Sequence, residues 1–190
     1  PGDVAAVAKL TGVDFFVFKD PATTETYTLR KPRVAMLQRY GGGNMDEGWT
    51  RLLFEQFSVP FKSIMDAELK AGGLEAKYDT IILPADSIAA MTGERPAAGV
   101  GGGGGGFGGG AENTPPEFRS GFGAEGVKAL QAFVEKGGTL VTFANAGDLA
   151  IQRFGLPLRN VVAGLPSKQF WSPGSTLKVT FNNTNPLAYG

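Results

Sequence analysis

Short apolar runs alternate along the chain with longer amphipathic stretches, a pattern typical of a parallel α/β fold. The clearest instance covers residues 33–57, RVAMLQRYGGGNMDEGWTRLLFEQF. Residues 34–37 are all apolar, as expected for a strand that is covered on both faces of a parallel sheet. The three glycines at 41–43 allow a sharp turn, and Asn44 followed by Glu47 resembles a capping box that opens a helix. This segment predicts the first strand–turn–helix unit of the fold.

Two long helices are predicted from amphipathic spacing. The first follows the glycine turn, and four of its apolar residues lie along one face: Trp49, Leu52, Leu53 and Phe57. The second covers residues 124–136 and ends at Gly137, which has the residue type expected at a helix C-terminus. Its predicted buried side holds Val127, Leu130, Phe133 and Val134.

Further short elements complete the pattern. Strands are predicted at residues 61–65, 78–84 and 138–144, and a fifth at 177–181, LKVTF. Short helices are predicted after Asp66, which would cap the first, and over residues 146–154. The fold class is therefore α/β, a flavodoxin-like three-layer sandwich with a mostly parallel sheet in the order 2-1-3-4. A domain that closes its sheet ordinarily needs more chain after the last strand, so we expect the fold to be cut short at the C-terminus.

Residues 1–32 are interpreted as a linker or the tail of a preceding module, and residues 33–190 as the α/β domain. Residues 3–10 have helical spacing that Gly12 would close, and residues 13–18 have the composition of a strand. The chain starts at Pro1 without an initiator Met or a signal peptide. We therefore expect it to be part of a longer polypeptide.

A glycine-rich loop is predicted at residues 97–116. Between residues 99 and 110 every residue except Val100 and Phe107 is glycine. Such a run is expected to be a flexible coil because it can bury little against its large backbone entropy. A phosphate-binding loop would need a defined turn into a helix and usually a Lys, and an RNA-binding segment would need interspersed Arg. Neither feature is present, so both functions are rejected.

Composition narrows the possible chemistry. The chain has 190 residues, of which 42% are hydrophobic, and its 18 basic and 18 acidic residues give zero net charge. This balance offers no electrostatic case for binding nucleic acid or an anionic membrane, and no apolar run is long enough to span a bilayer. There is no Cys and no His. The sequence thus excludes a thiolate nucleophile, an imidazole base and a zinc site built from these residues.

The candidate site residues follow predicted strands. Asp86 and Ser87 come directly after the strand at 78–84, and residues 145–148 follow the strand at 138–144. Open α/β sheets bind ligands at these carboxyl ends. Ser87 has no His to activate it, and Lys77 lies at the opposite end of the same strand. A hydrolase that acts through Asp86 and Ser87, or through Asp148, remains the alternative to a non-catalytic domain.

Asp46 and Glu47 are adjacent carboxylates that could suggest acid/base catalysis. Acidic residues in a first helical turn more often complement the helix dipole and cap free N–H groups. Their charge also argues against phosphate binding at this helix N-terminus, which would repel a further anion. We therefore interpret both residues as structural.

Several motifs occur in an order that resembles a known family. They are YGGGNMDEGWTR, YDTIILPADS, the glycine-rich insert with ENTPPEFRSG, FVEKGGTLVTFANAGDLAIQRFGLP and PGSTLKV. Together they resemble the C-terminal region of bacterial secreted zinc-carboxypeptidase-like proteins. In these proteins a class I glutamine-amidotransferase-like domain follows the peptidase domain. The resemblance covers about residues 30–190.

The resemblance implies an accessory domain without amidotransferase activity. The wider amidotransferase fold carries a Cys nucleophile in a pattern like G-I-C-x-G-x-Q, at the turn after a strand. Here the matching position falls on or next to Ala144, whose methyl group cannot attack a carbonyl. The family's zinc ligands belong to the upstream peptidase domain, so no metal or cofactor is expected in this chain. The resemblance also implies a secreted or periplasmic protein.

The proposed role is therefore that of a pseudoenzyme domain that binds a ligand at its strand ends. The partners expected are the preceding carboxypeptidase domain and a peptide or glycan, with no nucleic acid and no membrane span. The candidate binding residues are Tyr40, Gly42, Gly43, Asn44, Asp86, Ser87, Asn145 and Asp148. A pure spacer is a further alternative, favoured if aromatic side chains such as Phe122 or Trp171 fill the crevice.

Overall fold

The computed structural model describes residues 3–16, 31–40, 44–94, 115–172, 176–185 and 188. It divides into two units, Pro1–Pro32 and Arg33–Gly190. The glycine turn at 41–43 and almost all of the glycine-rich loop lie outside the described residues.

In the first unit the predicted helix is present as α1, Val4–Thr11. The Asp3 side chain accepts hydrogen bonds from the first turn, and Gly12 ends the helix with a φ of +68°. The strand-like pattern that follows does not form a strand over residues 13–16, and residues 17–18 lie outside the described part.

The second unit is built on a four-stranded parallel sheet in the order β2-β1-β3-β4, as the sequence predicts. The strands are β1 (Val34–Leu37), β2 (Phe61–Ile64), β3 (Thr80–Leu83) and β4 (Thr139–Thr142). In the register of the sheet, Val34 lies opposite Phe61 on one side and Thr80 on the other. β1 and β3 are therefore the central strands, and β2 and β4 flank them.

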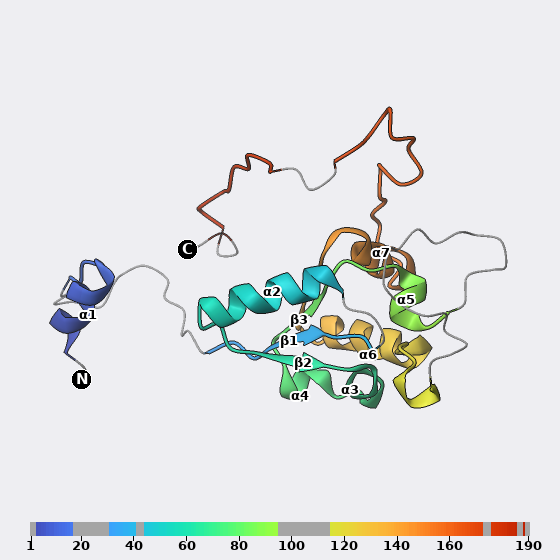
Figure 1. Ribbon diagram of the computed structural model, residues 1–190, viewed down its shortest axis with the longest axis horizontal. Coiled ribbons are helices and arrows are strands. Elements are labelled where there is room, and N and C mark those ends of the chain that lie inside the picture. The colour runs from blue at the N-terminus through green and yellow to red at the C-terminus, as the bar shows by residue number, and fades with distance from the viewer. Residues whose placement is uncertain are drawn as a thin grey trace. The chain divides into compact units, whose positions relative to one another are not determined.

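Helices cover both faces of this sheet, which gives the flavodoxin-like α/β sandwich (Figure 1). The long helices are α2 (Met45–Gln56) and α6 (Gly123–Glu135). The shorter ones are α3 (Asp66–Ala71), α4 (Leu74–Lys77), α5 (Ile88–Thr92) and α7 (Gly147–Arg153), with 3₁₀ turns at Pro116–Phe118 and Ala144–Ala146. α2 lies on one side of the sheet, and α3, α4 and α6 lie on the other (Figure 1).

The main core lies between the sheet and α3, α4 and α6. Alternate strand residues, such as Ile81 and Leu83 in β3, point into it because side chains alternate along a strand. Leu130 and Phe133 of α6 are fully buried against them, so this side of α6 is buried as its pattern predicts. Val134, which the same pattern places on the buried side, is exposed.

The opposite face is covered by α2, whose orientation is unexpected. Phe54 of α2 packs on Phe61 of β2, with 5.5 Å between the ring centroids, and Glu47 is buried. The apolar face recognised in the sequence points to solvent instead: Trp49 is 66% exposed and Phe57 is 75% exposed. The helix is correctly predicted, but its large apolar side chains do not form its contact with the sheet.

Two local predictions are wrong. Asp66 does not cap α3: it is the first residue of the helix, Met65 precedes it, and the Asp66 side chain accepts a hydrogen bond from Gly121 N. The segment at 177–181 forms no strand, and its residues are exposed. Strand composition alone does not supply a hydrogen-bonding neighbour, and this segment has none in the structure as described.

The described helices are all too short or too polar to cross a membrane.

Candidate functional site

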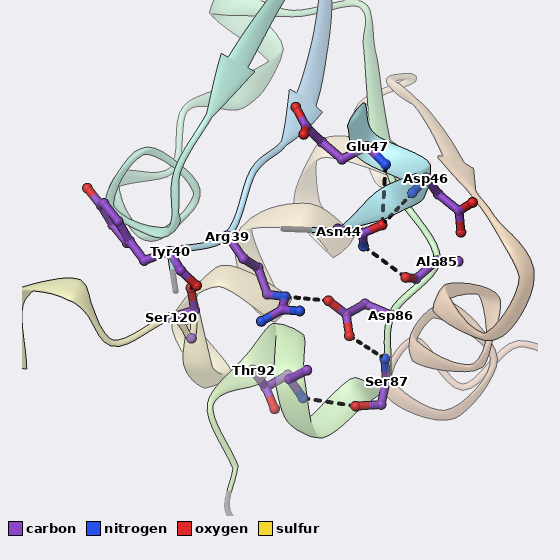
Figure 2. A network of polar contacts seen from close by, with 12 residues as sticks. Arg39, Tyr40, Asn44, Asp46, Glu47, Ala85, Asp86, Ser87, Thr92 and Ser120 are labelled. Carbon is purple, nitrogen blue, oxygen red and sulfur yellow. Dashed lines mark hydrogen bonds and ion pairs between the residues drawn. The ribbon is translucent and has the colours of Figure 1, made fainter. Parts of the chain in front are cut away.

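The candidate site lies where β1 and β3 end, at the switch point of the sheet. The chain leaves β1 toward α2 on one face, and leaves β3 toward α5 and then α6, which packs on the other face. Crevices of open α/β sheets form at such points, beyond the carboxyl ends of the strands. Figure 2 shows the polar side chains that the two strand ends bring together.

Asn44 joins the two strand ends. Its Oδ1 accepts hydrogen bonds from the backbone N–H groups of Asp46 at 3.0 Å and Glu47 at 3.2 Å, which caps α2 as predicted. Its Nδ2 donates to the carbonyl oxygen of Ala85 at 2.8 Å (Figure 2). One side chain thus starts the helix after β1 and fixes the loop after β3.

Arg39 and Asp86 form an ion pair across the same gap (Figure 2). Both side chains are largely buried, and the bond runs from Arg39 Nε to Asp86 Oδ2. Asp86 Oδ1 also accepts from Ser87 N at 2.9 Å. The Ser87 hydroxyl accepts from Ala90 N at 3.2 Å and caps α5. Asp86 and Ser87, the two catalytic candidates on this loop, are therefore both engaged in bonds that hold the local structure.

Tyr40 lies at the outer rim of the site. Its carbonyl oxygen accepts a hydrogen bond from the Ser120 hydroxyl at 3.0 Å, and its ring meets Phe118 edge-on at 5.9 Å. In Figure 2 the Tyr40 side chain points away from the Arg39–Asp86 pair. Tyr40 thus presents a partly exposed aromatic ring beside these strand ends.

Asp66 belongs to the same edge of the sheet, and the sequence interpretation missed its role there. It follows β2 by two residues and is 5% exposed. Its Oδ2 accepts from Gly121 N at 2.8 Å, whereas Oδ1 has no hydrogen-bond partner within the described residues. Burial raises the pKa of Asp66, opposed by the Gly121 hydrogen bond and by the charges of Lys70 and Arg39. Asp66 follows a predicted strand as Asp86 does, so its position at a strand end could have identified it as a candidate site residue.

Glu47 is the second buried carboxylate near these strand ends. It lies in the first turn of α2, and its Oε1 has no hydrogen-bond partner among the described residues. Arg51 Nη1 stands 3.8 Å from that oxygen, one helical turn further along. The residue is the N-terminal carboxylate that the sequence predicts, but it faces the sheet rather than solvent.

The turn after β4 contains the position that the family resemblance assigns to a nucleophile. Ala144 is exposed and has a φ of +44°, one of two non-glycine residues with positive φ in the described chain. This conformation disfavours a residue with a Cβ. A strained strand-to-helix turn is also the geometry that exposes the nucleophile in elbow-type hydrolases. At this turn Ala144 offers only a methyl group.

The other predicted residues after β4 do not join the β1–β3 network. Asn145 is exposed, and Asp148 Oδ1 accepts a hydrogen bond from Asn160 Nδ2 at 3.1 Å. Gly42 and Gly43 lie outside the described residues. The structure therefore brings together Asn44, Asp86 and Ser87, with Tyr40 at the rim.

Two further observations bear on the chemistry of the site. Phe122 is fully buried in the main core, and Trp171 is 76% exposed. Within the described ranges no group of three or more Asp or Glu side chains is placed to hold a metal ion. The chemical groups at these strand ends are a guanidinium and a carboxylate paired with each other, amide and hydroxyl groups, and an aromatic ring beside them.

Comparison with known proteins identifies no relative: no family model matches the chain, and neither the curated proteins nor the solved structures contain a significant match.

Proposed function

We propose that the α/β unit is a non-catalytic domain that binds a ligand at the carboxyl ends of β1 and β3. The observation that carries this proposal is the turn at Ala144. Ala144 follows β4 with a positive φ, as the nucleophile of an elbow-type hydrolase does, but its side chain cannot attack a substrate. The chain also has no Cys and no His to replace the missing chemistry.

The bonds that Asp86 and Ser87 already make support the same proposal. A general base or nucleophile needs a free lone pair or an activating partner within reach. Asp86 is instead neutralised by Arg39, and Ser87 caps α5. These bonds hold the two strand ends in a fixed arrangement, which suits binding better than proton transfer.

A hydrolase that uses Asp86 and Ser87, or Asp148, is the competing function. The test is to incubate the purified chain with glutamine and with a p-nitrophenyl ester and to measure product release against buffer. We expect no turnover above buffer. Turnover that is lost in Ser87→Ala, Asp86→Asn or Asp148→Asn, but kept in Asp46→Asn, would overturn the proposal and identify the catalytic group.

Binding itself can be tested by NMR titration with two defined probes, a short peptide with a free carboxyl terminus and a neutral oligosaccharide. We expect one of them to shift the backbone amides of Asn44, Asp86 and Ser87. Tyr40→Ala should weaken that binding because the ring flanks the crevice, whereas Lys128→Ala on the exposed side of α6 should not. Shifts spread evenly over the surface, or none with either probe, would contradict the binding role.

The wider context of the domain rests on the sequence resemblance. It suggests that the domain accompanies a zinc carboxypeptidase domain and is secreted or periplasmic with it. The zinc would be held by the peptidase domain and not by residues of this chain. The reading frame upstream of this chain tests the idea directly, because a zinc-ligand motif of His and Glu residues should be found there. A frame without such a motif would remove the link to peptidases but leave the binding proposal intact.

A further inference from the structure

An apolar pocket of about 350 Å³ lies at the edge of the sheet beside β4. The strand residues that line it are Leu140 and Thr142. They lie opposite Ile81 and Leu83 of β3, which point into the main core. Leu140 and Thr142 therefore face the same side of the sheet as the core residues. The pocket thus continues the main core outward at this edge.

The inner wall of the pocket is held by the core. Leu140 and Phe154 pack against the buried core residues, and Ala150 and Ile151 of α7 line the pocket beside them. Walls made of such side chains favour an apolar ligand over an ordered water, because a buried water needs about two to four polar partners. The pocket is therefore suited to an apolar molecule.

The outer wall of the pocket is accessible from solvent. Val134 in the last turn of α6 is 37% exposed, and Leu156 and Leu158 after α7 are 39% and 63% exposed. A ligand can therefore enter without unfolding of the sheet. The volume also lies within the range of about 300–1,000 Å³ that is typical of ligand pockets.

The volume and the lining limit the class of ligand. An apolar cavity of about 150 Å³ is large enough for benzene, and this pocket is roughly twice that size. Among the residues that the structure describes, no charged side chain lines it. A charged ligand would therefore lose its hydration without gaining an ionic partner. The fitting ligand is uncharged and has about two fused rings.

Thr142 offers one polar group to such a ligand. It is the last residue of β4, and open α/β sheets bind ligands at the carboxyl ends of their strands. A Cβ at Gly147 would lie 3.4 Å from Thr142 Oγ1, so the hydroxyl lies beside the Gly147 backbone that also lines the pocket. Within the described ranges this hydroxyl makes no hydrogen bond. It is therefore available to a ligand.

We propose that this pocket binds an uncharged aromatic molecule of about two fused rings that carries one hydroxyl or N–H group. The rings pack among Leu140, Ile151 and Phe154, and the polar group forms a hydrogen bond with Thr142 Oγ1. The pocket is separate from the Asn44 and Asp86 contacts at the ends of β1 and β3. The proposal therefore does not depend on the function proposed for those strand ends.

The probe that tests the proposal is 2-naphthol, which has two fused rings and one hydroxyl. In a titration of the whole chain, we expect the NMR methyl signals of Leu140 and Ile151 to shift and to saturate below about 1 mM. Naphthalene-2-carboxylate, a charged analogue, should bind at least about tenfold more weakly. Absence of saturable shifts at these methyl groups would overturn the proposal, and so would equal binding of the two probes.

Two matched variants test the location of the site. Ala150→Leu fills the pocket, and we expect it to abolish the binding of 2-naphthol. Ala124→Leu adds the same side chain at an exposed position of α6 outside the pocket, and it should leave binding unchanged. The amide signals of Ile81 and Ile82 in β3 report whether the sheet remains folded. Undiminished binding in a folded Ala150→Leu variant would overturn the proposal.

The hydrogen bond to Thr142 has its own test, which also serves if Ala150→Leu does not fold. Thr142→Val keeps the shape of the side chain and removes the hydroxyl. We expect 2-naphthol to bind about fivefold more weakly to this variant. Naphthalene, which has no hydroxyl, should bind as it does to the unchanged chain. An equal change for both probes, or none, would overturn the contact with Thr142.

Discussion

Helices α2 and α6 are similar in length and in sequence pattern, yet they use their apolar residues in opposite ways. α6 buries Leu130 and Phe133 completely in the main core. α2 contacts the sheet through Glu47 and Phe54 and leaves Trp49 and its apolar neighbours exposed. The comparison teaches that amphipathic spacing predicts a helix reliably, whereas the side that packs depends on the surface it meets.

The sharpest test of this difference is truncation of one large aromatic in each helix. Phe133→Ala should lower the free energy of unfolding by about 3–5 kcal/mol, because it opens a cavity in a packed core. Trp49→Ala should change it by less than about 0.5 kcal/mol, because its side chain is mostly in water. Urea denaturation followed by circular dichroism measures both.

If Phe133→Ala is too unstable to purify, Phe133→Leu should still cost more than Trp49→Ala. Equal costs in the two helices would show that the apolar side of α2 is also covered.

A second pair of variants adds a methyl group to each helix. At Gly126 in α6, a Cβ would lie 2.6 Å from the Cβ of Phe122, so Gly126→Ala should cost about 1–3 kcal/mol. At Gly48 in α2 nothing lies within 4 Å, and Gly48→Ala should stabilise by about 0.5–1 kcal/mol through helix propensity. Thermal unfolding should therefore shift in opposite directions for the two variants. A loss of stability in Gly48→Ala would mean that α2 packs more closely than described.

The face that carries α6 also buries Asp66, whose effect on stability depends on pH. Because burial raises the pKa of Asp66, the folded state holds its proton to higher pH than the unfolded state does. The contribution of Asp66 to the free energy of unfolding is therefore complete below the ordinary pKa of an aspartate. It is lost as the pH rises toward the pKa that Asp66 has in the folded state. Asp66→Asn keeps the acceptor for Gly121 and removes the charge. It should stabilise by about 1 kcal/mol at pH 7.

The pH profile separates this effect from a general change in packing. Between about pH 4 and pH 7, urea denaturation should show the gain of Asp66→Asn growing from near zero to its full size. A gain that is constant over the whole range would contradict the assignment to Asp66.

The sequence predicts the central strands well because their runs are apolar on both faces, and the order 2-1-3-4 follows from the connections. Asn44 and the Asp86 loop are found by rules that depend only on position at a helix start or strand end. The Arg39–Asp86 pair and the burial of Asp66 depend on contacts between residues far apart in the chain. The positive φ of Ala144 is likewise set by the turn that the residue occupies. The residue type does not predict it, because alanine favours the right-handed helical conformation.

The last contrast between the two helices is at their C-terminal ends, where the same hydrogen-bonded turn holds different residues. Gly138 N donates to Phe133 O after α6, and Val59 N donates to Phe54 O after α2. The residue in the left-handed conformation is Gly137 in the first turn, with φ +92°, but Ser58 in the second, with φ +52°. Ser58→Gly should therefore stabilise by about 0.5–1 kcal/mol, and Gly137→Ser should destabilise by a similar amount. Chemical denaturation of both variants checks this, and a destabilised Ser58→Gly would show that its side chain makes a contact worth more than the strain it relieves.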